Sequence, residues 1–393
     1  MSEEKTVVIL GSGVIGLSTG VALLERALES NQKLKVVLAA QYHPRPLKPE
    51  ESQDYLQQAL RAYPPSYASV WAGDTNDAFM GPIVKKTYEH LVKLESQFQQ
   101  RSTDFSSAPL HWVDQVEHYQ QPKNGPQEPW KDLFSYYPDY QELDKTEDVV
   151  FSCSFRTLDI DTRTYLPWLL TRFRELGGVV LPSFRFKSVQ SALNHDNVRQ
   201  ALEGQSRPDA VIVATGHSLP KADVPTQEEL DEQEKDFTLR GQVLRIRAPW
   251  RKSVGVSRVN EDGFRDLYVL PFSDGTFVVG GTRVPNDIDP NPQEDVTDAI
   301  LARILPMVPD LRKPDASTSA PLRDQVDIFA IGVGLRPSRK GGPRIELDSQ
   351  GVEKDIKLVW CYGFGGTGYQ SSWGAAFHVC ELLGMTSRPS SRQ

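Results

Sequence analysis

The sequence has few cysteines, no long hydrophobic run and no excess of positive charge. Its 393 residues include three cysteines, an odd number without a C-x-x-C pair, which argues against a disulfide framework or a structural zinc site. The 44 basic side chains are outnumbered by 52 acidic ones, so a net charge of −8 offers no positive field to nucleic acid or anionic lipid. The longest apolar runs, such as residues 7–10 and 211–214, are far shorter than the roughly 18 residues that cross a bilayer. We therefore expect neither nucleic acid nor a membrane as a partner.

The composition is otherwise that of a folded protein with more than one domain. Apolar residues make up 39% and charged residues 24% of the chain, which is long enough for two domains or three. The N-terminus is acidic and polar and lacks the basic and apolar regions of a secretory signal. The seven histidines show no metal-ligand spacing. These features predict an intracellular globular protein without a metal site.

A glycine-rich turn near the N-terminus separates a predicted strand from a predicted helix. Residues 7–10 have the pattern of a buried strand, residues 11–16 match G-x-G-x-x-G, and a second strand is expected at 35–39. In such a unit the missing side chains let the backbone approach a pyrophosphate at the positive end of the helix. An ordinary strand-to-helix turn is the alternative. Gln41 stands about where an acidic residue usually holds the ribose hydroxyls, which weakens the expected affinity for an adenosine.

The remaining pattern places a sheet-rich middle between elements of the nucleotide-binding fold. Amphipathic periodicity predicts helices at 85–100 and 164–176, strands at 179–181 and 208–216, and antiparallel strands at 242–248 and 268–281. The strand at 208–216 is expected to rejoin the N-terminal sheet. Segment 41–65 resembles a surface insertion with a short helix near 51–62, whereas 101–148 has too little periodicity to assign.

A second glycine pattern occurs near the C-terminus. Gly363, Gly365 and Gly368 follow a predicted strand and precede a predicted helix over 370–383. One interpretation is a helix N-terminus whose amides face negative charge that develops on a bound ring, and the other is a packed turn. A match to G-x-S-x-G at 16–20 lies inside the first predicted helix, so Ser18 is not expected to act as a nucleophile.

Several motifs together resemble the D-amino-acid oxidase family. Residues 333–346 and 362–376 resemble its two C-terminal signatures, and supporting matches occur at 11–16, 69–73, 155–169, 213–216 and 241–250. The resemblance implies an α/β protein with a discontinuous Rossmann-like FAD-binding domain and a second, mixed, β-rich substrate domain. We expect the FAD-binding domain to comprise 1–82, 156–234 and 321–393, and the substrate domain 83–155 and 235–320.

The resemblance also implies the chemistry and the cofactor-binding residues. Non-covalently bound FAD would take a hydride from the α-carbon of a D-amino acid and pass both electrons to O2, which gives hydrogen peroxide. The imino acid would then hydrolyse to a keto acid and ammonia. The positions that match the family's cofactor-binding residues are Gly11, Gly13, Val14, Ile15, Gly16, Gln41, Ser69, Ala72, Gly73, Thr215, Gly216, Gly334, Gly365, Gly366, Thr367, Gly368, Tyr369 and Gln370. Gly366 and Gln370 also match positions that contact substrate.

Three side chains form the predicted substrate site. By resemblance, Arg336 holds the substrate α-carboxylate with a planar bidentate fork, and the Tyr268 hydroxyl assists. Phe264 stands where animal members have a second tyrosine, so Tyr268 is expected to act alone. Arg283 resembles the arginine with which D-aspartate oxidases receive the side-chain carboxylate. The alternatives are a surface ion pair for Arg336, a core aromatic for Tyr268, and for Arg283 a strand end that faces solvent or pairs with Asp287 or Asp289.

The predicted hairpin over 268–281 indicates whether Tyr268 and Arg283 lie close together. If residues 274–275 form a two-residue turn, Tyr268 faces Gly281 across the hairpin. Arg283 then lies two residues further along the same face, with its Cβ roughly 7–8 Å from that of Tyr268. One substrate could touch both side chains, although a bulge just before the turn would shift this register.

We therefore predict an FAD-dependent oxidase of acidic D-amino acids, with D-aspartate first and oxaloacetate as its product. The alternatives are a broad oxidase of neutral D-amino acids and a flavin-binding protein without turnover. An NAD-dependent dehydrogenase is disfavoured because the second strand lacks the expected acidic residue. Family members are usually peroxisomal, but the terminal residues 391–393 are a poor match to the S-K-L type of import signal. The sequence leaves open whether the chain forms a homo-oligomer.

Overall fold

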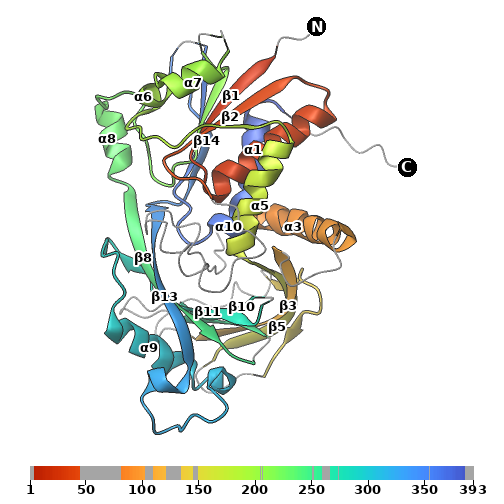
Figure 1. Cartoon of the computed structure of the whole chain (residues 1–393), viewed down its shortest axis with the longest axis vertical. Helices are drawn as coiled ribbons and strands as arrows, with labels where there is room; N and C mark the ends of the chain where they lie inside the picture. Colours follow the sequence, from red (N-terminus) through yellow and green to blue (C-terminus); the bar gives the residue numbers. More distant parts are fainter. Residues whose placement is uncertain are drawn as a thin grey trace.

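Two sheets organise the chain in the computed structural model. The structure describes residues 4–44, 81–101, 109–120, 134–144, 149–203, 205, 207–249, 252–258, 266–272, 274–353 and 355–385. The first sheet lies in the upper half of Figure 1 and the second in the lower half, with α10 between them. Among the described residues, no helix is both long and apolar enough to cross a membrane.

The first sheet is a doubly wound sheet covered by helices on both faces. Its strands are, in spatial order, β14 (Arg344–Leu347), β15 (Lys357–Tyr362), β7 (Ala210–Val213), β1 (Lys5–Leu10), β2 (Leu34–Ala39) and β6 (Val179–Val180). Every neighbouring pair is parallel except the edge pair β14–β15. Alternate residues of β1 enter two different cores, which is why its sequence is hydrophobic throughout. The predicted Rossmann-like fold is confirmed.

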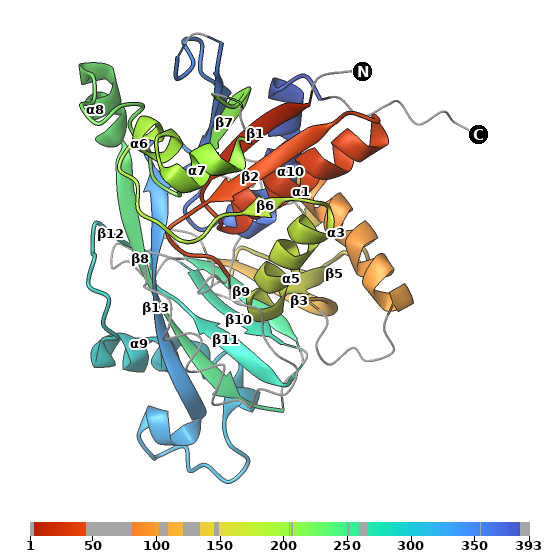
Figure 2. The same cartoon turned by 45° about the horizontal axis from the view of Figure 1, so that its top comes forward.

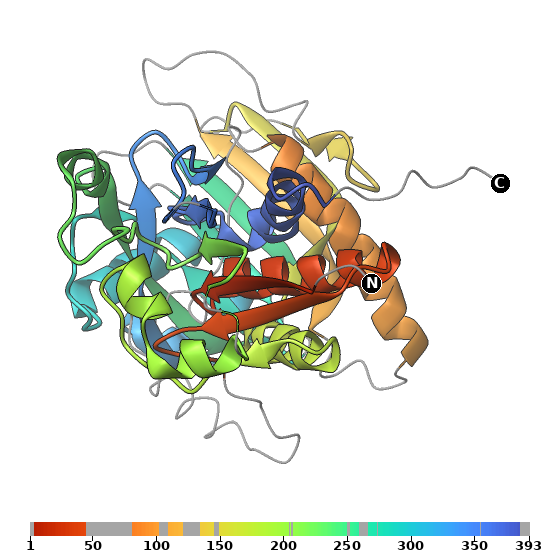
Figure 3. The same ribbon diagram turned by 90° about the horizontal axis from the view of Figure 1, so that it is seen from above.

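Helices cover the two faces of this sheet. One face packs against α1 (Val14–Glu29), α3 (Gly81–Arg101), α5 (Thr162–Glu175) and α10 (Gly368–Leu382). The other face packs against α6 (Val189–Leu193) and α7 (Asp196–Ala201). Seen from above in Figure 3, the yellow-green α6 and α7 lie on the side of the red strands away from the dark-blue α10.

The second sheet is mixed and lies beside α10. Its strands are, in order, β12 (Val284–Pro285), β8 (Asp236–Arg247), β11 (Thr276–Gly280), β10 (Asp266–Pro271), β9 (Ser253–Arg258), β3 (Leu110–Gln120), β5 (Phe151–Ile160) and β4 (Gln141–Glu142). The long β13 (Asp327–Arg339) pairs with β8, and Figure 2 shows the two running side by side, below α8 (Gln227–Gln233). The outer face packs against α9 (Glu294–Ile304), and two short 3-10 turns follow at Pro309–Leu311 and Leu322–Gln325. The inner face is turned towards α10.

The hairpin of β10 and β11 differs from the sequence expectation. The amide of Phe272 donates to the carbonyl of Thr276 at 2.8 Å, so the loop contains three residues where two were predicted. Tyr268 consequently pairs with Gly280 and not with Gly281. Gly275 has a φ of +80°, the left-handed conformation that three-residue hairpin loops require. Because β11 also ends at Gly280, the two-residue alternation does not extend to Arg283, and that argument for its position was wrong.

Other predictions concern the middle of the chain. The helix expected at 85–100 is confirmed as α3, and the segment left unassigned contains β3, which pairs along its length with β5. The predicted helix near 51–62 lies outside the described residues. The proposed domain boundaries stay a prediction: β13 lies in a segment given to the FAD-binding domain but pairs within the second sheet, and α3 packs on α10.

Candidate active site

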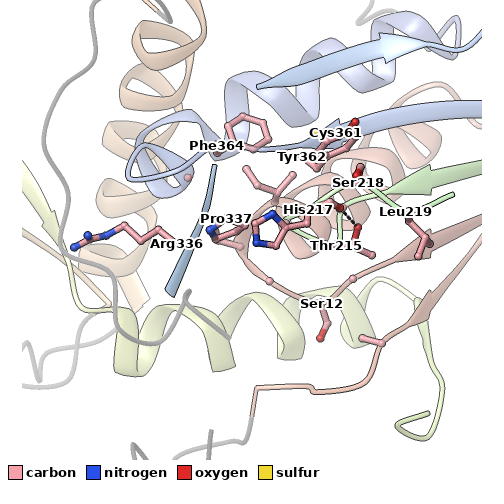
Figure 4. A pocket seen from close by; sticks show the side chains of 18 of the residues that line it. Ser12, Thr215, His217, Ser218, Leu219, Arg336, Pro337, Cys361, Tyr362 and Phe364 are labelled. Atoms are coloured by element: carbon pink, nitrogen blue, oxygen red, sulfur yellow. Dashed lines mark hydrogen bonds between the residues drawn. The ribbon is translucent and has the colours of Figure 1, made fainter. Parts of the chain in front are cut away.

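A cavity of about 420 Å³ lies at the carboxyl ends of the parallel strands. Parallel sheets bind ligands at this edge because the loops there surround the helix N-termini. The cavity is lined by the turns after β1, β2 and β7, by one end of β13 and by the loop before α10 (Figure 4). Its lining residues are Gly11, Ser12, Gly13, Val14, Ile15, Ala40, Gln41, Tyr42, Phe186, Ala214, Thr215, Gly216, His217, Ser218, Leu219, Arg336, Pro337, Cys361, Tyr362, Phe364, Gly365, Gly366, Gly368 and Tyr369.

The first glycine motif is required by close backbone packing. A Cβ on Gly11 would overlap the carbonyl of Ala214, and a Cβ on Gly16 would overlap the carbonyl of Gly11. Gly11 also has a φ of +114°, which side chains rarely adopt. Helix α1 therefore begins directly at the cavity wall. Its N-cap, Gly13, provides no side-chain acceptor and its first turn has no acidic residue, so the positive helix end fits the pyrophosphate of a dinucleotide.

The adenosine end of the cavity has uncharged polar groups. Gln41 lines the cavity, and its Nε2 donates to the Tyr42 hydroxyl at 2.9 Å. The Ser12 hydroxyl donates to the backbone carbonyl of Tyr42, which joins the turn after β1 to the turn after β2. An amide and a phenol thus stand where many dinucleotide-binding proteins have a carboxylate. No sequence signal identified Tyr42 or Phe186 as part of this wall.

Most of the predicted cofactor residues lie together in this cavity. Those that line it are Gly11, Gly13, Val14, Ile15, Gln41, Thr215, Gly216, Gly365, Gly366, Gly368 and Tyr369. Four others lie elsewhere: Gly16 inside α1, Gly334 on β13 opposite Gly241, Thr367 at the N-cap of α10, and Gln370 in a second cavity. Ser69, Ala72, Gly73 and Phe264 lie outside the described residues.

Arg336 projects from β13 over the inner face of the second sheet. Its guanidinium lies across Gly241 of β8, where any Cβ would overlap it. Nη1 donates to the carbonyl of Thr282 at 3.0 Å, and the side chain is 8% exposed. In Figure 4 the guanidinium points away from His217 and Thr215. A guanidinium has five N–H donors, so this position can also bind a carboxylate.

Tyr268 lies on the same inner face. The residue is 4% exposed, and its ring lies across Gly280, whose Cβ would be 2.6 Å from the hydroxyl oxygen. Within the described part of the chain the hydroxyl has no hydrogen-bond partner. A buried hydroxyl without a partner is costly, so this group is suited to bind a ligand.

Arg283 comes to the site from the chain that follows β11. Its Nη2 is 3.4 Å from the point that a Cβ on Gly366 would occupy, so the guanidinium lies against the loop before α10. Its neighbour Thr282 supplies the carbonyl that Arg336 contacts. Arg336 therefore contacts the residue that precedes Arg283 in the chain, and a joint role of the two arginines at the substrate stays a prediction.

The strand that carries Arg336 is also bonded to the loop that lines the cofactor cavity. The amide of Gly365 donates to the carbonyl of Pro337 at 2.8 Å, and Ser338 pairs with Phe364. A Cβ on Gly365 would be 2.9 Å from the Ser338 hydroxyl, so the two segments are in close contact. Arg336 and part of the cavity wall thus share one strand.

These features define a dinucleotide-binding α/β protein with a cationic site beside the dinucleotide. Residues 6–382 match the family of FAD-dependent oxidoreductases, so the chain belongs to this family and uses FAD. It is 28% identical to the D-aspartate oxidase of Cryptococcus neoformans var. grubii, with 99% of each chain covered. It is 25% identical to the D-amino-acid oxidase of Fusarium vanettenii, with 97% of each covered. The crystal structure of glycine oxidase from Geobacillus kaustophilus has the same fold, with a TM-score of 0.64, 16% identity and 98% and 95% coverage.

The close packing of α1 leads to a prediction about FAD binding. Gly16→Ala is expected to give protein with little bound flavin, because the added methyl group would push α1 away from the Gly11 carbonyl. The flavin absorbance per mole of purified protein measures the effect. Gly81→Ala is the matched control, since among the described residues no atom apart from its chain neighbours lies within 4 Å of a Cβ there. Equal flavin content in the two variants would contradict the proposed fit.

Proposed function

We propose that this protein oxidises acidic D-amino acids, D-aspartate first, to the keto acid and ammonia with formation of hydrogen peroxide. The observation that supports this most directly is the placement of two arginines: Arg336 donates to the carbonyl of Thr282, and the guanidinium of the next residue, Arg283, lies against Gly366. A substrate with two carboxylates offers one anionic group to each of them. Its likeness to the D-aspartate oxidase of Cryptococcus neoformans agrees with this assignment.

Each arginine has a different role in this proposal. Arg336 is the more buried of the two and is fixed by its hydrogen bond to Thr282, so it binds the α-carboxylate, which every amino acid has. Arg283 lies against the N-terminal loop of α10 and binds the carboxylate of the substrate side chain. The Tyr268 hydroxyl donates to the α-carboxylate and orients the α-carbon. FAD, when bound, supplies the hydride acceptor.

Gly241, Gly280 and Gly366 leave room for the three side chains of the proposed substrate site. Side chains at the first two positions would overlap the Arg336 guanidinium or crowd the Tyr268 ring, and one at Gly366 would press on Arg283. Backbone therefore lies beneath these side chains, and among the described residues the site presents the guanidiniums of Arg336 and Arg283 and the phenol of Tyr268. This composition favours a small dianion over an apolar side chain.

A panel of amino acids tests the proposal. Oxygen uptake and peroxide release by the purified yellow protein should be fastest with D-aspartate, slower with D-glutamate and D-alanine, and absent with L-aspartate. Faster turnover of D-alanine or D-valine than of D-aspartate would instead support a broad D-amino-acid oxidase, the activity named for the Fusarium relative. Flavin without any peroxide release would indicate a binding protein.

A further inference from the structure

A second, smaller cavity adjoins the substrate site on the inner face of the second sheet. Its volume is about 110 Å³, and it shares no lining residue with the cofactor cavity. Tyr268 and Gln370, two residues of the predicted substrate site, line it together with residues of α3 and β5. A cavity of this size can hold about three water molecules at roughly 30 Å³ each.

The wall of this cavity contains a buried carboxyl group without a partner. Oδ2 of Asp159, near the end of β5, has no contact with solvent and no hydrogen bond within the described part of the chain. The hydroxyls of Tyr88 and Tyr268, which line the same cavity, are likewise buried without a partner there. Three unpaired oxygen atoms around one cavity provide the two to four polar contacts that an enclosed water needs.

Asp159 is the group in this cavity that exchanges a proton near neutral pH. Desolvation by burial raises its pKa to about 7. Tyr88, which faces it from α3, stays protonated because burial raises its pKa to about 12. From β3, Glu117 accepts a hydrogen bond from Gln115 at 2.8 Å, and His111, the cross-strand partner of Asp159, is bonded to the carbonyl of Pro271 at 3.0 Å. Tyr268 faces the cavity from β10.

We propose that Asp159 accepts, through water in this cavity, the proton that the substrate ammonium group must lose before oxidation. This inference rests on the proposed function. In the transfer, an N–H bond of the ammonium breaks and an O–H bond forms on Asp159, which leaves a neutral amine and a carboxylic acid. The freed nitrogen lone pair then forms the C=N bond while the Cα–H bond breaks, its hydrogen and both electrons leaving as hydride to FAD. Asp159 returns its proton to solvent before the next turnover.

The pH dependence of flavin reduction tests this proposal. In anaerobic stopped-flow mixing with saturating D-aspartate, the wild-type rate should fall about tenfold per pH unit below an apparent pKa near 7, because protonated Asp159 cannot accept a proton. Asp159→Asn should lower the rate at pH 8 by about 10²-fold and remove this inflection. Asp114→Asn, an exposed change on the neighbouring β3, should behave as wild type.

The pH dependence of Tm tests whether Asp159 ionises near pH 7, independently of its role in the reaction. A raised pKa means that the folded protein loses stability as the pH rises from about 4 through about 7. Asn cannot ionise, so the Tm of Asp159→Asn relative to wild type should increase between pH 5 and pH 8. An unchanged inflection in this variant, with D-amino acids still reducing the flavin, would overturn the proton-acceptor role alone. A failure of every D-amino acid to reduce the wild-type flavin would instead overturn the proposed function, and this role with it.

Discussion

Arg336→Leu is expected to lower kcat/KM for every D-amino acid that the protein oxidises by about 30- to 4,000-fold. Removing one partner of a desolvated charge pair costs about 2–5 kcal/mol, which corresponds to that range. The loss should be similar for D-aspartate and D-alanine, because both present an α-carboxylate to Arg336. Arg336→Lys keeps the charge but not the planar fork, so it should recover only part of the activity.

Two controls distinguish a loss of substrate binding from misfolding of the variant: its flavin content and a substitution at the surface. Arg336→Leu should keep the yellow colour, because its guanidinium points away from the residues of the cofactor cavity that Figure 4 labels around His217. Arg174→Leu, an exposed change on α5, should leave kcat/KM unchanged. Near-normal activity of a yellow Arg336→Leu variant would mean that another group holds the α-carboxylate.

Arg283→Ala is expected to separate acidic from neutral substrates. Turnover of D-aspartate should fall by about 10²-fold or more, because its second carboxylate would enter the site without a partner. Turnover of D-alanine should change little or improve, since it makes no contact with Arg283. The measurement is kcat/KM for both substrates, with Arg174→Ala as the surface control.

The role of Arg283 is decided by the ratio of kcat/KM for D-aspartate to kcat/KM for D-alanine. Equal losses on D-aspartate and D-alanine would show that Arg283 supports the loop at Gly366 and does not bind the substrate side chain. A malonate complex in which this side chain is turned away from the anion would lead to the same conclusion.

The cofactor half of the protein could be predicted from sequence because its signals are local. A strand, three spaced glycines and a helix follow one another within residues 5–29, and the structure places residues 11–15 of this unit at the cavity wall. The second glycine pattern likewise gave the loop and helix at Gly363–Leu382. Short-range patterns identify such units because each residue is constrained by its neighbours in the chain.

The substrate half was predicted less well because its geometry depends on contacts between distant segments. The hairpin register was wrong by one residue, since a three-residue loop with a left-handed Gly275 replaced the expected two-residue turn. The pairing of β3 with β5 has no short-range signature, so Glu117 and Asp159 could not be placed near Tyr268. Arg283 was chosen by resemblance, and only the fold shows that Thr282 joins it to Arg336.

Strand β13 has a consequence for how the two ligands affect each other. Arg336 is followed directly by Pro337 and Ser338, which contact the loop at Phe364 and Gly365, so one continuous segment contacts both proposed binding sites. When one ligand binds and orders this segment, the second ligand no longer bears the entropic cost of ordering it. Binding of FAD should therefore raise the affinity for a dicarboxylate, and binding of a dicarboxylate should raise the affinity for FAD by the same factor. Flavin-free protein should hold a dicarboxylate inhibitor weakly, and the same inhibitor should slow the escape of flavin from the complete enzyme.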